Sequence, residues 1–227
     1  MTGRSPHEPS FTMIGRGKTF LVGGLSMIAT PKLRRLTPQE YFEWEAQQEL
    51  RYEYFDGEVF AMTGGSLPHG RIGLNVSSLL KSHVRGKGCI VLNSDCKVGI
   101  SEKGPFTYPD ASVSCDQRDR TAEDFIRFPC LIVEVLSPGT EAYDRGGKFA
   151  LYRRLESLQE YVLVGSETKI VEVFRRNQQG TWVFVPYGES DEIELTSVGL
   201  TIPMAAIYED VILAQSETQE SPLAEEG

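Results

Sequence analysis

The stretch Phe128–Leu136, FPCLIVEVL, limits most strongly what this chain can fold into. A continuous apolar run of this kind is typical of a strand covered on both faces, and therefore of a sheet with helices on either side. Glu134 lies in the middle of the run. Because burying an unpaired carboxylate costs several kcal/mol, Glu134 requires a cation, a proton or a metal ion beside it.

The rest of the chain contains both helical and strand-like segments. A capping box at Thr37–Glu40 predicts the start of a helix, and Asp56-Gly57 predicts a hairpin over 52–62. Apolar residues at helical spacing predict a helix over 68–85, and a further helix is expected over about 140–155. With the strands between and after them, we expect an α/β (α+β) fold whose central mixed β-sheet is flanked by helices.

The length of 227 residues suits one globular domain with tails. We expect the domain over 31–213, a flexible N-terminal extension over 1–30 outside the fold, and a disordered acidic tail over 214–227. No run reaches the roughly 18 apolar residues that a membrane span needs, so no membrane partner is predicted.

The net charge of −9 argues against a protein that coats DNA by charge alone. An ion held between acidic residues would offset part of that charge.

The four cysteines form no CxxC motif and have no neighbouring histidine at zinc spacing. Three of them lie in apolar, strand-like runs, where a free cysteine behaves as a small hydrophobic residue. We therefore expect reduced core cysteines in a cytosolic, cytoplasmic protein. The residues concerned are Cys89, Cys96, Cys115 and Cys130.

A second acidic residue, Asp110, begins another strand-like run directly after Pro109. Strand alternation sets Asp110 and Ser112 on the same face. If this strand pairs with the one that carries Glu134, the two carboxylates can converge on an oxygen-preferring cation such as Mg²⁺. The alternative is an Asp at a strand-end turn and a Glu paired with a nearby Lys or Arg.

Two basic residues belong to helices that face the same region. Lys148 shares a helical stripe with Asp144 and Tyr152, which should face the sheet. Its alternative role is an ordinary ion pair with Asp144. His69 lies three residues before Ile72 on the inward face of the earlier helix, and its alternative is a structural histidine with its hydrogen bonds satisfied.

Several short motifs together resemble the Uma-two endonuclease family, a restriction endonuclease domain of the PD-(D/E)XK nuclease superfamily. The resemblance covers roughly residues 30–213. The motifs that carry it are Asp56-Gly57-Glu58-Val59, Gly64-Gly65-Ser66 with His69, Tyr108-Pro109-Asp110, and Glu134-Val135-Leu136-Ser137-Pro138-Gly139-Thr140 continuing to Asp144, Lys148 and Tyr152.

The resemblance implies a restriction-endonuclease-like core with Mg²⁺ as cofactor and Mn²⁺ as a substitute. The metal would be held by Asp110, Glu134 and the carbonyl of Val135. The superfamily places a lysine two residues after the acidic residue, but this chain has Leu136 there. Some members supply the lysine from the next helix, and Lys148 is the matching candidate, which would stabilise charge on the phosphoryl oxygens or orient the attacking water.

The remaining implied roles are supporting ones. His69 resembles a helix-borne histidine that assists the metal, Glu58 is a further acid near the site, and Tyr152 steadies the helix of Lys148. Three arginines would contact DNA phosphates, positioning the duplex without reading its sequence. They are Arg145, Arg153 and Arg154.

The function implied is a metal-dependent endonuclease that hydrolyses DNA phosphodiester bonds. DNA is then the partner, and a homodimer is compatible with the resemblance. The alternative is a catalytically inactive protein that keeps the nuclease fold and serves as a nucleic-acid-binding or mobile-element accessory protein. Leu136 and the charge of −9 favour this alternative, whereas the retention of Asp110, Glu134 and Lys148 opposes it.

Overall fold

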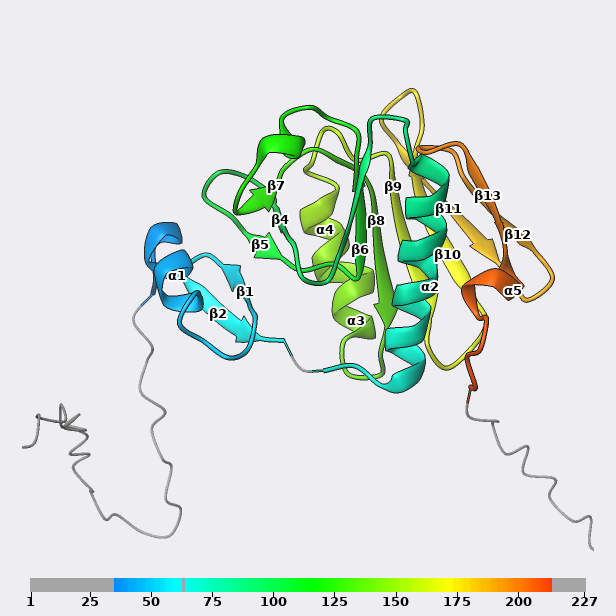
Figure 1. The fold of residues 1–227 in the computed structure, drawn as a ribbon, viewed down its shortest axis with the longest axis horizontal. Coiled ribbons are helices and arrows are strands. Elements are labelled where there is room, and N and C mark those ends of the chain that lie inside the picture. Colours follow the sequence, from blue (N-terminus) through cyan, green and yellow to red (C-terminus); the bar gives the residue numbers. More distant parts are fainter. Residues whose placement is uncertain (1–34, 63, 214–227) are drawn as a thin grey trace, which may run out of the picture. The chain divides into compact units, whose positions relative to one another are not determined.

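A computed structural model describes residues 35–62 and 64–213 (Figure 1). The predicted extension over 1–30 and the predicted tail over 214–227 lie outside the described residues. Among the residues that are described, no helix is both long enough and apolar enough to cross a bilayer.

The largest sheet has six strands in the order β11-β10-β9-β8-β6-β3. Strand β8 pairs with β9 in parallel and with β6 in antiparallel fashion, and the other pairs are antiparallel. The predicted central mixed sheet is therefore confirmed. The strands are β3 (Ile90–Asn93), β6 (Ala111–Ser114), β8 (Pro129–Leu136), β9 (Glu160–Gly165), β10 (Val171–Arg176) and β11 (Trp182–Tyr187).

Both faces of β8 are covered, as its apolar sequence requires. On one face, alternate residues such as Leu131 and Val133 form a cluster with Ile72 and Val76 of α2 (Leu67–Val84). On the other face, Ile132 belongs to a second cluster that includes the helical segment after β8 (Figure 1). That segment comprises α3 (Glu141–Tyr143), the π-helical turn η2 (Asp144–Lys148) and α4 (Phe149–Tyr152).

A second sheet has five short strands in the order β2-β1-β5-β4-β7. The predicted hairpin at Asp56-Gly57 is confirmed, with both residues at positive φ between β1 and β2. The predicted capping box is also present at the start of α1 (Pro38–Glu45). The strands are β1 (Tyr52–Phe55), β2 (Glu58–Ala61), β4 (Lys97–Gly99), β5 (Phe106–Thr107) and β7 (Phe125–Ile126).

The remaining elements complete the cover of the large sheet. Residues of β12, β13 and α5 join the cluster on the α2 face. These elements are the hairpin of β12 (Glu192–Leu195) with β13 (Leu200–Pro203), and α5 (Met204–Ile207). A short 3-10 helix, η1 (Asp119–Thr121), lies between β6 and β7 in the chain.

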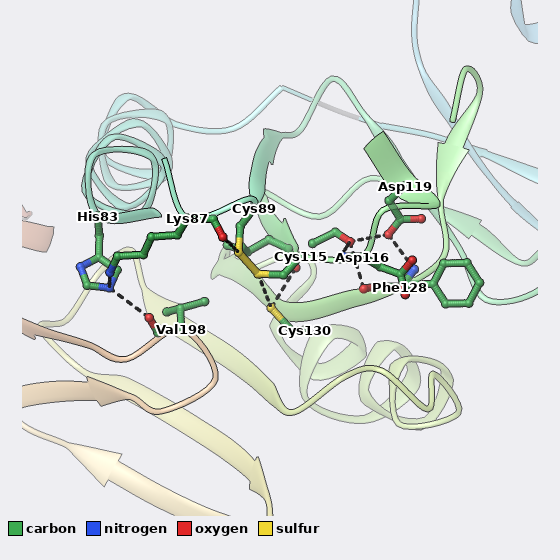
Figure 2. Close-up of a disulfide and its surroundings, with 11 residues drawn as sticks. His83, Lys87, Cys89, Cys115, Asp116, Asp119, Phe128, Cys130 and Val198 are labelled. Atoms are coloured by element: carbon green, nitrogen blue, oxygen red, sulfur yellow. Dashed lines mark hydrogen bonds between the residues drawn. A yellow bond between two sulfur atoms is a disulfide. The ribbon is translucent and has the colours of Figure 1, made fainter. Parts of the chain in front are cut away.

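The prediction that all four cysteines are reduced is wrong, because Cys89 and Cys115 form a disulfide bond (Figure 2). The physical reason is the register of two strands. Ile90 of β3 pairs with Ser114 of β6, and continuing that antiparallel register by one residue sets the two cysteines opposite each other. Their Cα atoms are 4.0 Å apart. The predicted cytoplasmic location, which relied partly on reduced thiols, loses that support.

Candidate active site

Asp110 and Glu134 come together on neighbouring strands, as predicted. Ala111 at the start of β6 pairs with Val133 of β8, so the next step of the antiparallel register sets Asp110 opposite Glu134. Asp110 Oδ2 accepts a hydrogen bond from the backbone N–H of Val135 at 2.7 Å. The Asp110 carboxylate is therefore held against β8 at the residue that directly precedes β6.

His69 reaches the same carboxylate from the first turns of α2. Its Nε2 lies 3.0 Å from Asp110 Oδ1, and most of both side chains is buried. The hydrogen bond with Asp110 raises the pKa of His69 above its ordinary value, against the opposing effect of burial. The other ring nitrogen, Nδ1, is buried and has no hydrogen-bond partner in the described part of the chain.

Glu134 is only 3% exposed. Its Oε1 accepts hydrogen bonds from Lys148 Nζ at 3.0 Å and from the hydroxyl of Tyr152 at 2.8 Å. Burial raises the pKa of Glu134 to about 8, and the nearby Lys148 ammonium opposes that rise. The cation expected beside this buried carboxylate is therefore Lys148, and the Tyr152 hydroxyl lies between α4 and β8.

Lys148 Nζ lies among three carboxylates. It is 3.0 Å from Glu134 Oε1, 3.3 Å from Asp144 Oδ1 and 3.5 Å from Glu53 Oε1. Burial alone would lower the pKa of Lys148, but these carboxylates raise it above its ordinary value. The lysine therefore remains an ammonium ion at neutral pH.

The helix predicted over 140–155 is present as a continuous helical segment over 141–152, but it widens into a π turn at the residues that supply this lysine. The turn Asp144–Lys148 is π-helical, and both of its end residues are buried. A π turn contains one extra residue relative to an α turn, and such turns recur at functional sites. Gly146 and Gly147 occupy its middle.

Two acidic residues of this cluster were not predicted as site residues. Glu53 comes from β1, where its carboxylate accepts the backbone N–H of Tyr108 at 3.2 Å. The sequence shows a single acid in the otherwise aromatic segment Tyr52–Phe55, and its burial is evident only in the structure. Asp144 was expected on the inward stripe of the helix and in the family motif, but as an ion-pair partner of Lys148 rather than as a site residue.

Other predicted residues are not brought to this cluster. Glu58 is 59% exposed and its carboxylate forms an ion pair with Arg35. The guanidinium of Arg145 forms ion pairs with Glu141 and Glu172. Arg153 and Arg154 are exposed at the C-terminal end of α4.

The cluster lines a cleft of about 310 Å³. Its ionisable lining, among the described residues, contains four carboxylates, one lysine and one histidine besides Tyr108 and Tyr143. The four carboxylates belong to Glu53, Asp110, Glu134 and Asp144. A larger cleft of about 540 Å³ along α2 shares His69 and Asp110 with it, which places these two side chains where the clefts meet.

The donor set of the smaller cleft fits a hard divalent cation. Four carboxylates face one ammonium, and burial raises the pKa of Glu134 to about 8, with the charges of Asp110, Asp144 and Glu53 adding to the rise. No group of three or more His, Cys, Asp or Glu side chains in the described ranges is arranged to hold a metal ion. Mg²⁺ requires only one or two protein carboxylates, because it retains several water ligands.

Comparison with a solved structure agrees with this architecture. The chain resembles a crystal structure described as a "putative nuclease belonging to DUF820" from Anabaena variabilis, with a TM-score of 0.63, 16% identity, and coverage of 76% of this chain and 97% of that chain. At this identity the likeness shows the fold alone, which is a mixed α/β fold.

Sequence comparison identifies the family. Residues 38–205 match Uma2, described as "Putative restriction endonuclease", and the chain belongs to that family. Two similar proteins occur in Synechocystis sp. (strain ATCC 27184 / PCC 6803 / Kazusa). The uncharacterized protein slr1290 is 47% identical over 174 residues, which cover 77% of this chain and 92% of the relative. The uncharacterized protein sll1609 is 31% identical over 175 residues, which cover 76% and 98%.

Proposed function

We propose that this protein is an endonuclease that uses Mg²⁺, or Mn²⁺ in its place, to hydrolyse phosphodiester bonds in DNA. The observation that carries the proposal is the pair of Asp110 and Glu134 on adjacent strands, with Lys148 hydrogen-bonded to Glu134. Membership of a restriction endonuclease family supports a nucleic-acid substrate.

The cation would be held by Asp110 and Glu134, with the backbone carbonyl of Val135 as a third oxygen donor. When bound, it supplies a Lewis acid that polarises the phosphodiester and lowers the pKa of a water molecule. Asp110 is oriented for this role by Val135 N–H on one oxygen and by His69 on the other.

Lys148 supplies the positive charge that the missing lysine at Leu136 would supply in other members of the superfamily. An ammonium at this position stabilises negative charge as it develops on phosphoryl oxygens. Glu53 and Asp144 hold the ammonium in place, and the hydroxyl of Tyr152 fixes the Glu134 carboxylate beside it.

The test is nicking of supercoiled plasmid during titration with Mg²⁺ and Mn²⁺. We expect cation-dependent nicking that Asp110→Asn and Glu134→Gln abolish and that Lys148→Ala lowers by about 100-fold or more. Glu58→Gln is the matched control, because that carboxylate is exposed and paired with Arg35 outside the cleft. Equal nicking by wild type and Asp110→Asn would overturn the proposal, and so would nicking that is insensitive to EDTA.

A further inference from the structure

Two large aromatic side chains are exposed at the cleft that contains the carboxylates. Phe60, on β2, is 50% exposed, and Tyr143, at the end of α3, is 41% exposed. Both line the cleft together with Asp110 and Glu134. Leaving rings of this size in water is costly, and exposed aromatic residues beside polar groups mark binding sites.

The two rings are held by the residues around them. The ring of Phe55 makes edge contacts with both, at centroid distances of 5.6 Å to Phe60 and 6.1 Å to Tyr143. Tyr143 also lies against Gly147 of the π turn, where a Cβ atom would collide with its ring. The absence of a side chain at Gly147 therefore allows the orientation of Tyr143.

The charges around the cleft do not favour a ligand held mainly through its phosphates. Lys148 is surrounded by carboxylates, and Arg145 is neutralised by Glu141 and Glu172. Affinity for nucleic acid normally comes from phosphate contacts with Lys and Arg, or from stacking of bases on aromatic side chains. The described lining of this cleft therefore offers stacking of bases on aromatic rings more readily than phosphate contacts with Lys or Arg.

We propose that Phe60 and Tyr143 form a stacking platform for unpaired nucleobases, so that the preferred ligand is single-stranded or locally unpaired DNA. Bases within an intact duplex present only their edges and cannot stack on protein rings. This inference rests on the proposed function, because it takes the strand that stacks here to be the one whose phosphodiester lies at Asp110 and Glu134.

The experiment measures binding of fluorescent oligonucleotides to the full chain by anisotropy, in EDTA so that no cleavage occurs. The probes are a single-stranded oligonucleotide, a blunt duplex, and a single strand of equal length whose central nucleotides are abasic. We expect the intact single strand to bind at least about tenfold more tightly than the abasic strand, because the two carry the same phosphates and differ in bases.

The variants separate stacking from general packing. Phe60→Leu and Tyr143→Leu keep apolar volume but remove the ring, and each should weaken single-strand binding by about tenfold while leaving duplex binding unchanged. Tyr143→Phe keeps the ring and should bind as wild type does. The matched control is Phe184→Leu, because Phe184 is 49% exposed but lies on β11, at an edge of the large sheet.

Each remaining outcome overturns the inference. Equal binding of intact and abasic strands would show that bases do not contribute. Equal losses for Phe60→Leu and Phe184→Leu would show a general effect of removing exposed rings. The plasmid assay is independent of these measurements, so plasmid nicking by wild type with ring-independent binding would remove the stacking platform while leaving the nuclease proposal intact.

Discussion

Asp110 accepts the backbone N–H of Val135, the residue that directly follows Glu134. The contact ties one carboxylate to the backbone beside the other, and His69 occupies the second oxygen of Asp110. The Asp110 carboxylate is therefore positioned by hydrogen bonds to both of its oxygens.

Replacing Asp110 by Asn tests this arrangement. The amide nitrogen has no lone pair to accept from Val135 N–H or to pair with a protonated His69, so one of the two contacts is lost. We expect the free energy of unfolding to fall by about 1–2 kcal/mol in EDTA. The stabilisation that Mg²⁺ gives, which grows as RT ln(1 + [L]/Kd), should disappear. Thermal denaturation with and without Mg²⁺ measures both effects, and a Mg²⁺-induced shift retained in Asp110→Asn would contradict the prediction.

Glu134 should make stability depend on pH in the metal-free protein. Its pKa is about 8 in the folded state and ordinary in the unfolded state, so the folded state binds the proton more tightly. The contribution is fully present below about pH 4.5 and is lost as the pH rises to about 8. The unfolding free energy should therefore fall over that interval, in chemical denaturation performed in EDTA.

The variant Glu134→Gln isolates this effect from His69, whose raised pKa acts in an overlapping interval. Glutamine keeps an oxygen to accept from Tyr152 but carries no charge. The variant should be as stable as wild type or more stable at pH 8, and its stability should decline less between pH 5 and pH 8. A strongly destabilised Glu134→Gln would instead identify Glu134 as a structural ion-pair partner.

Lys148→Ala should separate the ammonium from the acids. Removing it leaves Glu53, Glu134 and Asp144 without their common cation, which should cost about 3–5 kcal/mol of stability in EDTA at pH 8. Mg²⁺ should then raise the melting temperature at least as much as in wild type, while plasmid nicking is lost. Absence of any Mg²⁺-induced shift in this variant would contradict the assignment of the acids as metal ligands.

The disulfide closes a loop with a sequence separation of 26 between Cys89 and Cys115. Constraining a loop of that length in the unfolded chain stabilises the folded state by about 3 kcal/mol. The double variant Cys89→Ser/Cys115→Ser should lose about that much in urea denaturation, whereas Cys96→Ser, which removes a free thiol, should lose little. Equal stability of wild type with and without reductant would contradict the prediction.

Much of the large sheet could be predicted because each of its signals is local. Glu134 within an apolar strand and Asp110 at the start of another are visible in short segments, and antiparallel pairing of neighbouring strands brings them together. Glu53 could not be found in this way. Its strand belongs to the other sheet, and its position at Lys148 depends on tertiary packing that includes the pairing of Tyr54 with Phe106.

The π turn within the helix after β8 and the disulfide were missed for related reasons. Periodicity predicts one continuous helix, but a single extra residue in the turn Asp144–Lys148 changes which side chains face inward. The spacing of Cys89 and Cys115 in the chain carries no information about pairing until the register of β3 and β6 is known. Both features change when the chain shifts by a single residue, within the helical turn or between the paired strands. Composition and periodicity do not specify a position to that precision.

The order of the charged groups along the chain has a consequence for protein synthesis. Glu53, Asp110, Glu134 and Asp144 all precede Lys148. The ribosome therefore synthesises every acid of the cleft before Lys148, whose ammonium balances them. It also synthesises them before β9, the parallel neighbour of β8. A chain that terminates between Asp144 and Lys148 therefore carries the four acids with neither their counter-charge nor β9.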